Sequence, residues 1–428
     1  RIRNFSLFFY LDLSHPLITD DPYMILEQNN LSINKDQYSY FKASGYTLNN
    51  ETLFEKIYEV KPGEITIIDN KKHQHHPYYQ LQEYPSHQEE DLIEVLDKIF
   101  EDTFKAIGDR PIALPLTGGY DSRLIAAYCK KHNKSPYCYT YGRAASPEIK
   151  NAQLTAERLG FKWEFIAYND YDKEKDPSFE SYYQKMGHIS SSFFLQDFPA
   201  LKYLKKKLPS NTVFIGGHSA DMIAGSKIKK DDIKISDDKK RSQTILKDIT
   251  VYHHLTKREK KKALSLIQSE FIFHSFKDLI YSNMINRQAR LINNSTRIFG
   301  HFGFQHFLPF WHHEFINFFL SASFEDLYLK RLYNKTLENH IFSYYNIQFE
   351  STEVLTSKKF SLQKLKDRIK PYLPSSIQEH FINKNDILNY QKLTHSIQKE
   401  LRDNQVPFKI KQDYNSVLIQ WYLWKILK

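Results

Sequence analysis

The sequence is poor in the residues that staple small secreted domains and in the long apolar runs that cross membranes. It has only two cysteines, Cys129 and Cys138, which are too few for a disulfide framework or a four-cysteine zinc site. No stretch approaches the roughly 20 apolar residues that a membrane-spanning helix needs. The best candidate, residues 5–13, is short and is interrupted by Asp12. These absences predict a soluble, cytoplasmic protein.

The chain is rich instead in apolar and basic residues. Hydrophobic residues make up 41% of the 428 positions, enough for a large core, and the length is typical of two or three domains. The 60 lysines and arginines against 50 acidic residues give a formal net charge of +10. Many lysines stand in runs between residues 202 and 262, which are either a surface for an acidic polymer or ordinary solvated side chains. We expect a charged, mobile loop at 229–241.

Residues 1–85 show no regular alternation of strands and helices. Their β-branched and aromatic runs predict strands at 5–11 and 64–68. The histidine-rich segment 73–77 lacks a cysteine or carboxylate partner, so a surface turn is favoured over a metal site. We therefore expect a partial, β-rich unit at 1–85.

Residues 86–428 follow a different pattern. Ser86 and Glu89 have the spacing of a capping box, which predicts that a helix begins there. Strands then alternate with helices up to about residue 235, and a long helix is expected at 178–208. The expected strands lie at 111–116, 137–141, 163–166 and 212–215. This order predicts an α/β fold with a doubly wound, mostly parallel sheet at 86–235, followed by a helical part at 236–428.

The segment 116–123 (LTGGYDSR) carries the clearest chemical signal. It lies between an expected strand and an expected helix, where doubly wound sheets bind ligands. Its two glycines let backbone N–H groups approach an anion, and the hydroxyls of Thr117 and Ser122 add donors. Asp121 suits a Mg²⁺ that bridges phosphate oxygens. The lysine and spacing of a Walker loop are absent, so the segment predicts a different loop for phosphate and metal.

A second loop repeats the arrangement. Residues 215–221 (IGGHSAD) also follow an expected strand and also end in an aspartate, Asp221. Because parallel strands end at the same edge of a sheet, we expect Asp121 and Asp221 to share one Mg²⁺.

Taken together, these motifs resemble the asparagine synthetase-like ligases, which carry a pyrophosphate loop of the form S-G-G-x-D-S. Thr117 stands where that family usually has serine, and 216–221 is similar to its G-x-G-A-D-E loop. Further similar segments follow in the family order, at 139–160, at 307–312 and at Lys335. The resemblance spans about residues 85 to 365. It implies an ATP-dependent carbon–nitrogen ligase that forms an acyl-adenylate and pyrophosphate before an amine or ammonia attacks.

The resemblance also implies which residues act. Asp121 and Asp221 would hold Mg²⁺, and Lys358 or Lys359 would neutralise the charge that develops on ATP. The residues implied around the nucleotide are Leu116, Thr117, Gly118, Gly119, Asp121, Ser122, Arg123, Tyr141, Gly142, Gly216 and Gly217. Three residues depart from the family, and one of them is Met222, which replaces the acid that normally follows the aspartate. His218 replaces a glutamate. It would act as a base on the incoming amine, bind an acidic group of the substrate, or be a loop residue that is merely held in position. Arg123 replaces a small residue, and we expect it to pair with a phosphate or a carboxylate.

Residues 43–64 are similar to the end of the family's glutaminase domain, which normally begins with a catalytic cysteine. This sequence begins with Arg1, so the glutaminase-like part is either degenerate or lacks an upstream piece, and a separate glutaminase is one possible partner. The predicted substrates are a small-molecule or polymer-linked carboxylate, from a secondary metabolite, peptide or sugar acid, and an amine or ammonia donor. The alternatives are a genuine asparagine synthetase, an RNA-modifying adenylating enzyme and a non-catalytic scaffold. No dedicated RNA-binding module is evident, so a nucleic-acid partner is not favoured.

Overall fold

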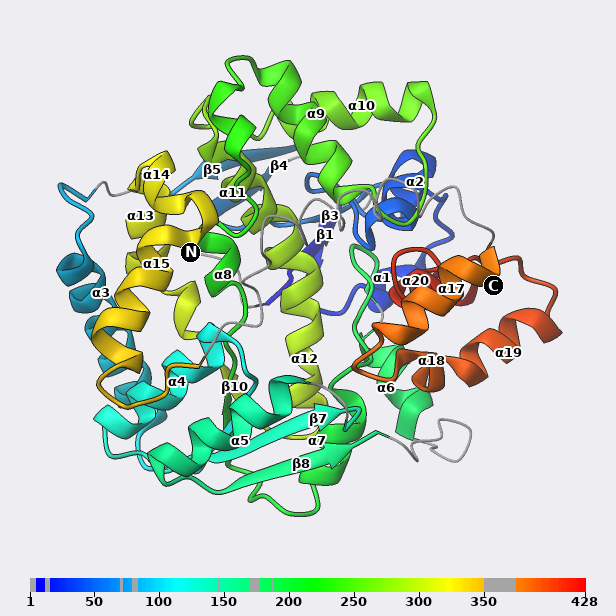
Figure 1. Ribbon diagram of the computed structural model, residues 1–428. Coiled ribbons are helices and arrows are strands. Elements are labelled where there is room, and N and C mark those ends of the chain that lie inside the picture. The colour runs from blue at the N-terminus through cyan, green and yellow to red at the C-terminus, as the bar shows by residue number, and fades with distance from the viewer. Residues whose placement is uncertain are drawn as a thin grey trace.

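A computed structural model gives the fold of the chain (Figure 1). The structure describes residues 5–11, 16–69, 72–78, 84–144, 147–168, 178–186, 188–349 and 375–428. Among these residues, no helix is both long enough and apolar enough to cross a membrane.

The centre of the molecule is a five-stranded parallel sheet with the order β10-β9-β6-β7-β8. Its strands are β6 (Ile112–Pro115), β7 (Tyr137–Gly142), β8 (Trp163–Ala167), β9 (Val213–Ile215) and β10 (Gln305–Phe307). The chain runs from β6 outward through β7 to β8 and then crosses to β9 on the other side of β6. The strand order therefore reverses between β6 and β9, which is where an α/β sheet leaves a crevice for ligands. The predicted α/β fold is confirmed.

Two hydrophobic cores cover the two faces of this sheet. The strands are apolar on both faces, as buried parallel strands must be, and successive side chains alternate between the cores. Ile112 and Leu114 point into one core, whereas Ala113 between them points into the other. The helices α3 (Glu89–Ile107), α4 (Tyr120–Lys131) and α5 (Pro147–Leu159) contribute to the first core, while α6 (Ser178–Met186) and α7 (Phe198–Leu204) contribute to the second.

The N-terminal residues pack into these same cores. Their elements are β1 (Phe8–Tyr10), β2 (Leu17–Thr19), α1 (Tyr23–Gln28), α2 (Lys35–Ser44), β3 (Ile57–Glu59), β4 (Glu64–Asp69) and β5 (Lys72–Pro77). Tyr46 and Leu48 belong to the first core, and Phe8 and Phe41 belong to the second. The connection near Pro85 therefore does not separate two independently packed cores.

The remaining elements are mostly helical, and together they contribute to both cores. One of them, α12, lies beside the sheet (Figure 1). They are α8 (Ala220–Ile223), η2 (Lys230–Lys234), α9 (Asp238–Ile249), α10 (Lys257–Gln268), α11 (Lys277–Asn283), the π-helix η3 (Met284–Ile292), α12 (Asn293–His301), η4 (Pro309–Trp311), α13 (His313–Ser321), α14 (Phe324–Leu327), η5 (Tyr328–Lys330), α15 (Arg331–Thr336), η6 (Leu337–Phe342), α17 (Ser375–Lys384), α18 (Tyr390–Leu393), α19 (His395–Asp403) and α20 (Asn415–Ile426).

Four expectations about secondary structure were wrong. Segment 73–77 is strand rather than turn, because β5 pairs with β4 along its whole length. The helix expected at 178–208 is interrupted at 188–197, where Tyr46 forms a bridge with Ser191. Helix α3 begins at Glu89 with Gln88 as its N-cap, and its capping box uses Asp91.

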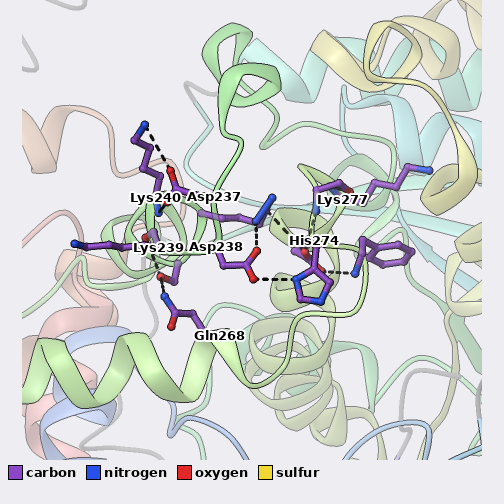
Figure 2. A network of polar contacts seen from close by, with 12 residues as sticks. Asp237, Asp238, Lys239, Lys240, Gln268, His274 and Lys277 are labelled. Atoms are coloured by element: carbon purple, nitrogen blue, oxygen red, sulfur yellow. Dashed lines mark hydrogen bonds and ion pairs between the residues drawn. The ribbon is translucent and has the colours of Figure 1, made fainter.

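The fourth correction concerns residues 229–241, which form η2 and the start of α9 instead of a mobile loop. Figure 2 shows the network that orders the start of α9. Asp237 accepts a hydrogen bond from the Lys240 backbone, and Asp238 accepts one from His274 Nδ1 at 2.9 Å. Lys240 lies 3.5 Å from Asp237, and Lys229 lies 2.9 Å from Asp248. Several lysines of the basic runs are thus paired locally.

Candidate functional site

Two loops meet at the carboxyl edge of the central sheet. The first, residues 116–119, joins β6 to α4, and the second, residues 216–219, joins β9 to α8. Because β6 and β9 are hydrogen-bonded neighbours in the sheet, the two loops leave it side by side. They flank the reversal of strand order, which is the edge of the sheet where the sequence predicts the site.

Bonds within the first loop fix its shape. The Thr117 amide donates to the Ser122 hydroxyl at 3.0 Å, and the Gly119 amide donates to Thr117 Oγ1 at 3.1 Å. A β-carbon at Gly118 would lie only 3.2 Å from the Glu148 backbone, so the loop packs tightly against α5. These bonds use the Thr117 and Gly119 amides, and the loop leads into the N-terminus of α4, where the first amides of a helix form an anion-binding arrangement.

Side chains from the helical half hold the second loop. Ser219 has a φ of 75°, in the left-handed region that non-glycine residues rarely adopt. Its hydroxyl donates to Gln288 Oε1 at 2.7 Å and accepts a hydrogen bond from Trp311 Nε1 at 3.0 Å. These contacts compensate for the unfavourable backbone and fix the loop from outside.

The two loops touch at a glycine. A β-carbon on Gly217 would lie 3.0 Å from Asp121 Cβ and 3.4 Å from the Ser122 amide nitrogen. The Asp221 amide donates to Asp121 Oδ2 at 3.3 Å. The structure thus brings the two predicted metal ligands, Asp121 and Asp221, to one place.

The environment of Asp121 disfavours its negative charge. Burial and the neighbouring charge of Asp221 together raise the pKa of Asp121 to about 7, although the Tyr333 hydroxyl and Lys330 act in the opposite direction. The Tyr333 hydroxyl donates to Asp121 Oδ1 at 2.9 Å. A carboxylate pair that repels itself in this way is stabilised by a bound cation.

The donor set fits Mg²⁺ shared with phosphate. Among the described residues, no three histidine, cysteine or carboxylate side chains form a group that could hold a metal. Mg²⁺, however, is commonly held by one or two carboxylates and completes its shell with waters and phosphate oxygens. Asp121 and Asp221 beside the first loop match that requirement.

Leu116 and Arg123 do not line an open site. Leu116 is fully buried, and its backbone is bonded to Tyr139 and Thr140. Arg123 is 4% exposed, and its guanidinium donates to the Ile347 carbonyl at 2.9 Å. It also lies over the rings of Tyr120, Phe342 and Phe349, at 4.6 to 5.3 Å from their centres. In this structure the Arg123 side chain anchors α4 to the helical half, and its pairing with a phosphate or a carboxylate stays a prediction.

Tyr141 and Gly142 end β7, one strand away from the first loop. The Tyr141 hydroxyl donates to Asp197 Oδ1 at 2.6 Å, and its ring stacks on Tyr168. Gly142 has a φ of 122°, and a β-carbon there would lie 2.6 Å from the Ile387 carbonyl oxygen. Gly142 is needed for this close approach, so the end of β7 is packed against the C-terminal region.

His218 belongs to the second loop and lines a large cavity beside it. A β-carbon on Gly216 would lie 2.6 Å from His218 Nδ1, so the glycine makes room for the ring. Burial lowers the pKa of His218 below its ordinary value, against the opposing charge of Asp197. The imidazole is therefore neutral near pH 7, which suits a base better than an anion-binding group.

Sequence reasoning missed the side chains that support the two loops. Tyr333, Gln288 and Trp311 lie 212, 69 and 92 residues from the groups that they contact. No local spacing signals such pairs. Lys358 and Lys359, the expected catalytic lysines, lie outside the described residues.

Comparison with known proteins gives one broad match and two narrow likenesses. A family model described as asparagine synthase matches residues 95–339, more than half of the chain. The curated "Amidase chry2" of Gibberella zeae (strain PH-1) is 33% identical over 94 residues, which cover 20% of this chain and 14% of that protein. The chain thus matches about one seventh of that relative's length.

A solved structure from Methanocaldococcus jannaschii, described as a predicted subunit of tRNA methyltransferase, is 20% identical and covers 44% of this chain and 91% of its own. Its TM-score of 0.17 is too low to support a structural argument. The broad match and the pyrophosphate-type loop agree, and the chain therefore belongs to the asparagine synthase family, an ATP-dependent family of carbon–nitrogen ligases.

Proposed function

We propose that this protein activates a carboxylate with ATP, forming an acyl-adenylate and pyrophosphate, and that an amine or ammonia then attacks the acyl carbon to give an amide and AMP. The observation that carries the proposal is the meeting of Asp121 and Asp221 beside a loop built to bind phosphates. Mg²⁺ held by this pair would offset the charge that develops on the departing pyrophosphate.

Each part of the site has a separate task in this proposal. Backbone and hydroxyl donors of 117–122 receive the pyrophosphate, chiefly the amides at the start of α4 that the loop's own bonds leave open. Gly216 and Gly217 line the nucleotide, with Tyr141 and Gly142 behind it at the end of β7. Neutral His218 takes a proton from the attacking amine. Lys358 or Lys359 supplies the positive charge opposite the phosphates.

The second loop bears on substrate choice. His218 and Met222 replace two acidic residues that the resemblance leads us to expect, and both line the cavity beside the second loop. We therefore propose a carboxylate other than aspartate, drawn from a secondary metabolite, peptide or sugar acid.

A pyrophosphate-release screen over carboxylates and amines tests the proposal. We expect release that depends on a carboxylate, with and without ammonia, and its loss in both Asp121→Asn and Asp221→Asn. Retained turnover in both variants would overturn the metal assignment. Activity with aspartate and ammonia would instead make the protein an asparagine synthetase, and failure to bind Mg-ATP would point to a scaffold.

A further inference from the structure

A cavity of about 840 Å³ opens beside the second loop. Gly217, His218 and Asp221 line it on one side, and the π-helix η3 lines it on another. Its lining includes no residue of the first loop, 116–119, so it lies on the side of Asp221 that faces the helical half. This position suits the substrate whose carboxylate meets ATP.

The cavity has room for a ligand larger than a four-carbon amino acid. Cavities of roughly 300–1,000 Å³ enclose most of a drug-sized ligand. A substrate that fills this one extends well past Asp221, and its distal part then lies against η3 and the N-terminal residues Tyr46 and Leu48.

The charged side chains of the cavity differ in whether they have partners. Lys229 is paired with Asp248 at 2.9 Å, and Asp413 accepts a hydrogen bond from the Asn415 amide at 2.8 Å. Arg287 is half-buried, and within the described part of the chain no hydrogen bond or ion pair engages its guanidinium. Its charge acts on Asp413, Tyr46 and Tyr252 without a direct bond to them.

The π-helix explains why Arg287 faces the cavity. Its neighbours in η3 are buried and bonded: Asn286 donates to Glu270, and Arg290 donates to Glu59 at 2.9 Å. Gln288 accepts the Ser219 hydroxyl of the second loop. One widened turn thus fixes the loop with Gln288 and presents a free guanidinium with Arg287. π-Helical turns occur frequently at functional sites.

We propose that Arg287 binds a second anionic group of the substrate, a carboxylate, on the wall of this cavity that η3 forms. This inference rests on the proposed adenylation of the first carboxylate at Asp121 and Asp221. A planar guanidinium forms two parallel hydrogen bonds to a carboxylate, which gives orientation as well as affinity. The substrate class is therefore an extended diacid, activated at one end and held by Arg287 at the other.

Linear dicarboxylates of four to ten carbons and their monomethyl esters are the probes. Calorimetry without ATP measures binding, and carboxylate-dependent exchange of pyrophosphate into ATP measures activation. We compare the unaltered protein with Arg287→Gln, Arg287→Lys and Lys229→Gln. The last variant removes the same charge from the same cavity, but from a lysine that already has a partner.

We expect a diacid of suitable length to bind more tightly than its half-ester. Arg287→Gln should weaken diacid binding and raise its KM about 10- to 100-fold, with kcat and the half-ester unchanged. Arg287→Lys should recover part of the loss, and Lys229→Gln should have little effect. Because none of the described residues forms a hydrogen bond or ion pair with the Arg287 guanidinium, its variants should unfold at the same temperature as the unaltered protein.

The outcomes separate this site from the reaction. Diacid binding that depends on Arg287, without any exchange, would uphold the anion site and count against adenylation. Exchange that is equal for diacids and half-esters, and unaffected by Arg287→Gln, would uphold adenylation and overturn the anion site. Absence of diacid binding across the whole series would also overturn it.

Discussion

The loop after β6 and the loop after β9 leave the same sheet edge, yet different parts of the chain hold them in place. The first is fixed by Thr117 and Ser122, which belong to the loop and its helix. The second is fixed by Gln288 and Trp311, which come from the helical half. The self-contained loop departs from the family pattern only by Thr117 in place of serine, whereas the externally held loop carries His218 in place of glutamate.

This difference separates two tasks. Phosphate binding needs only local donors, so a short sequence motif specifies it, whereas the proposed metal site joins Asp121 to Asp221, which follows the second loop. Substrate choice needs a loop whose position follows the shape of a cavity, and here the cavity wall itself holds the loop. Variants in the two loops should therefore affect different substrates of the reaction.

The largest effect that separates the loops is expected at His218. His218→Gln should slow amide formation by about 100-fold or more while leaving pyrophosphate exchange intact, because a base acts only on the amine. Since burial lowers the pKa of His218, the imidazole stays neutral until the pH falls below the ordinary pKa of a histidine. Amide formation should fall on that acidic side, and the variant should lose this dependence. A pH profile of both half-reactions measures this dependence. Equal losses of exchange and amide formation in the variant would contradict the division between the loops.

The next largest effect is expected at the contact between the two loops, where Gly217 approaches Asp121. Gly217→Val should lower pyrophosphate exchange by about 100-fold, since a side chain there separates Asp121 from Asp221. Gly300→Val is the matched control, because nothing lies within 4 Å of a β-carbon at that helical glycine. Full activity in Gly217→Val would show that the loops need not touch.

A matched pair of variants should change the KM for ATP and the KM for the carboxylate separately. Ser122→Ala removes a bond inside the first loop and should raise the KM for ATP about tenfold. Gln288→Leu removes the support of the second loop and should raise the KM for the carboxylate by a similar factor. Gln398→Leu, at a buried glutamine bonded within α19, controls for a general loss of stability. Identical effects of Ser122→Ala and Gln288→Leu on both substrates would contradict the division.

The smallest effect is expected away from both loops. Lys240 is exposed and lies 3.5 Å from Asp237, in the network of Figure 2. Lys240→Ser should change the free energy of unfolding by no more than about 0.5 kcal/mol and leave both half-reactions unchanged. Denaturant unfolding and the exchange assay check this. A marked loss of activity would assign the basic runs a role.

The sequence alone predicted the sheet and its ligand edge because those features depend on local pattern. The buried runs at 112–115 and 137–142 and the adjacent glycines of the first loop are readable without tertiary contacts. Strand β5 was missed because its pairing with β4, not its composition, makes it a strand. Strand β10 was missed because it forms only by parallel register with β9, about 90 residues earlier.

The candidate site follows the same division. Asp121 and Asp221 were predicted from two short motifs, and the structure places them together. Tyr333, Gln288 and Arg287 were not, because their roles arise from helices that reach the site only in the folded chain. The packing of Arg123 was not predicted either, because a charged residue beside a phosphate loop carries no local sign of the aromatic rings that surround it.

The central claim is that the carboxylate oxygen attacks the α-phosphorus of ATP. The most direct measurement uses a substrate carboxylate labelled with ¹⁸O, followed by mass spectrometry of the nucleotide and phosphate products after amide formation. The account predicts one ¹⁸O atom in each AMP and none in pyrophosphate. Label in inorganic phosphate with ADP as the nucleotide product, or unlabelled AMP, would contradict it.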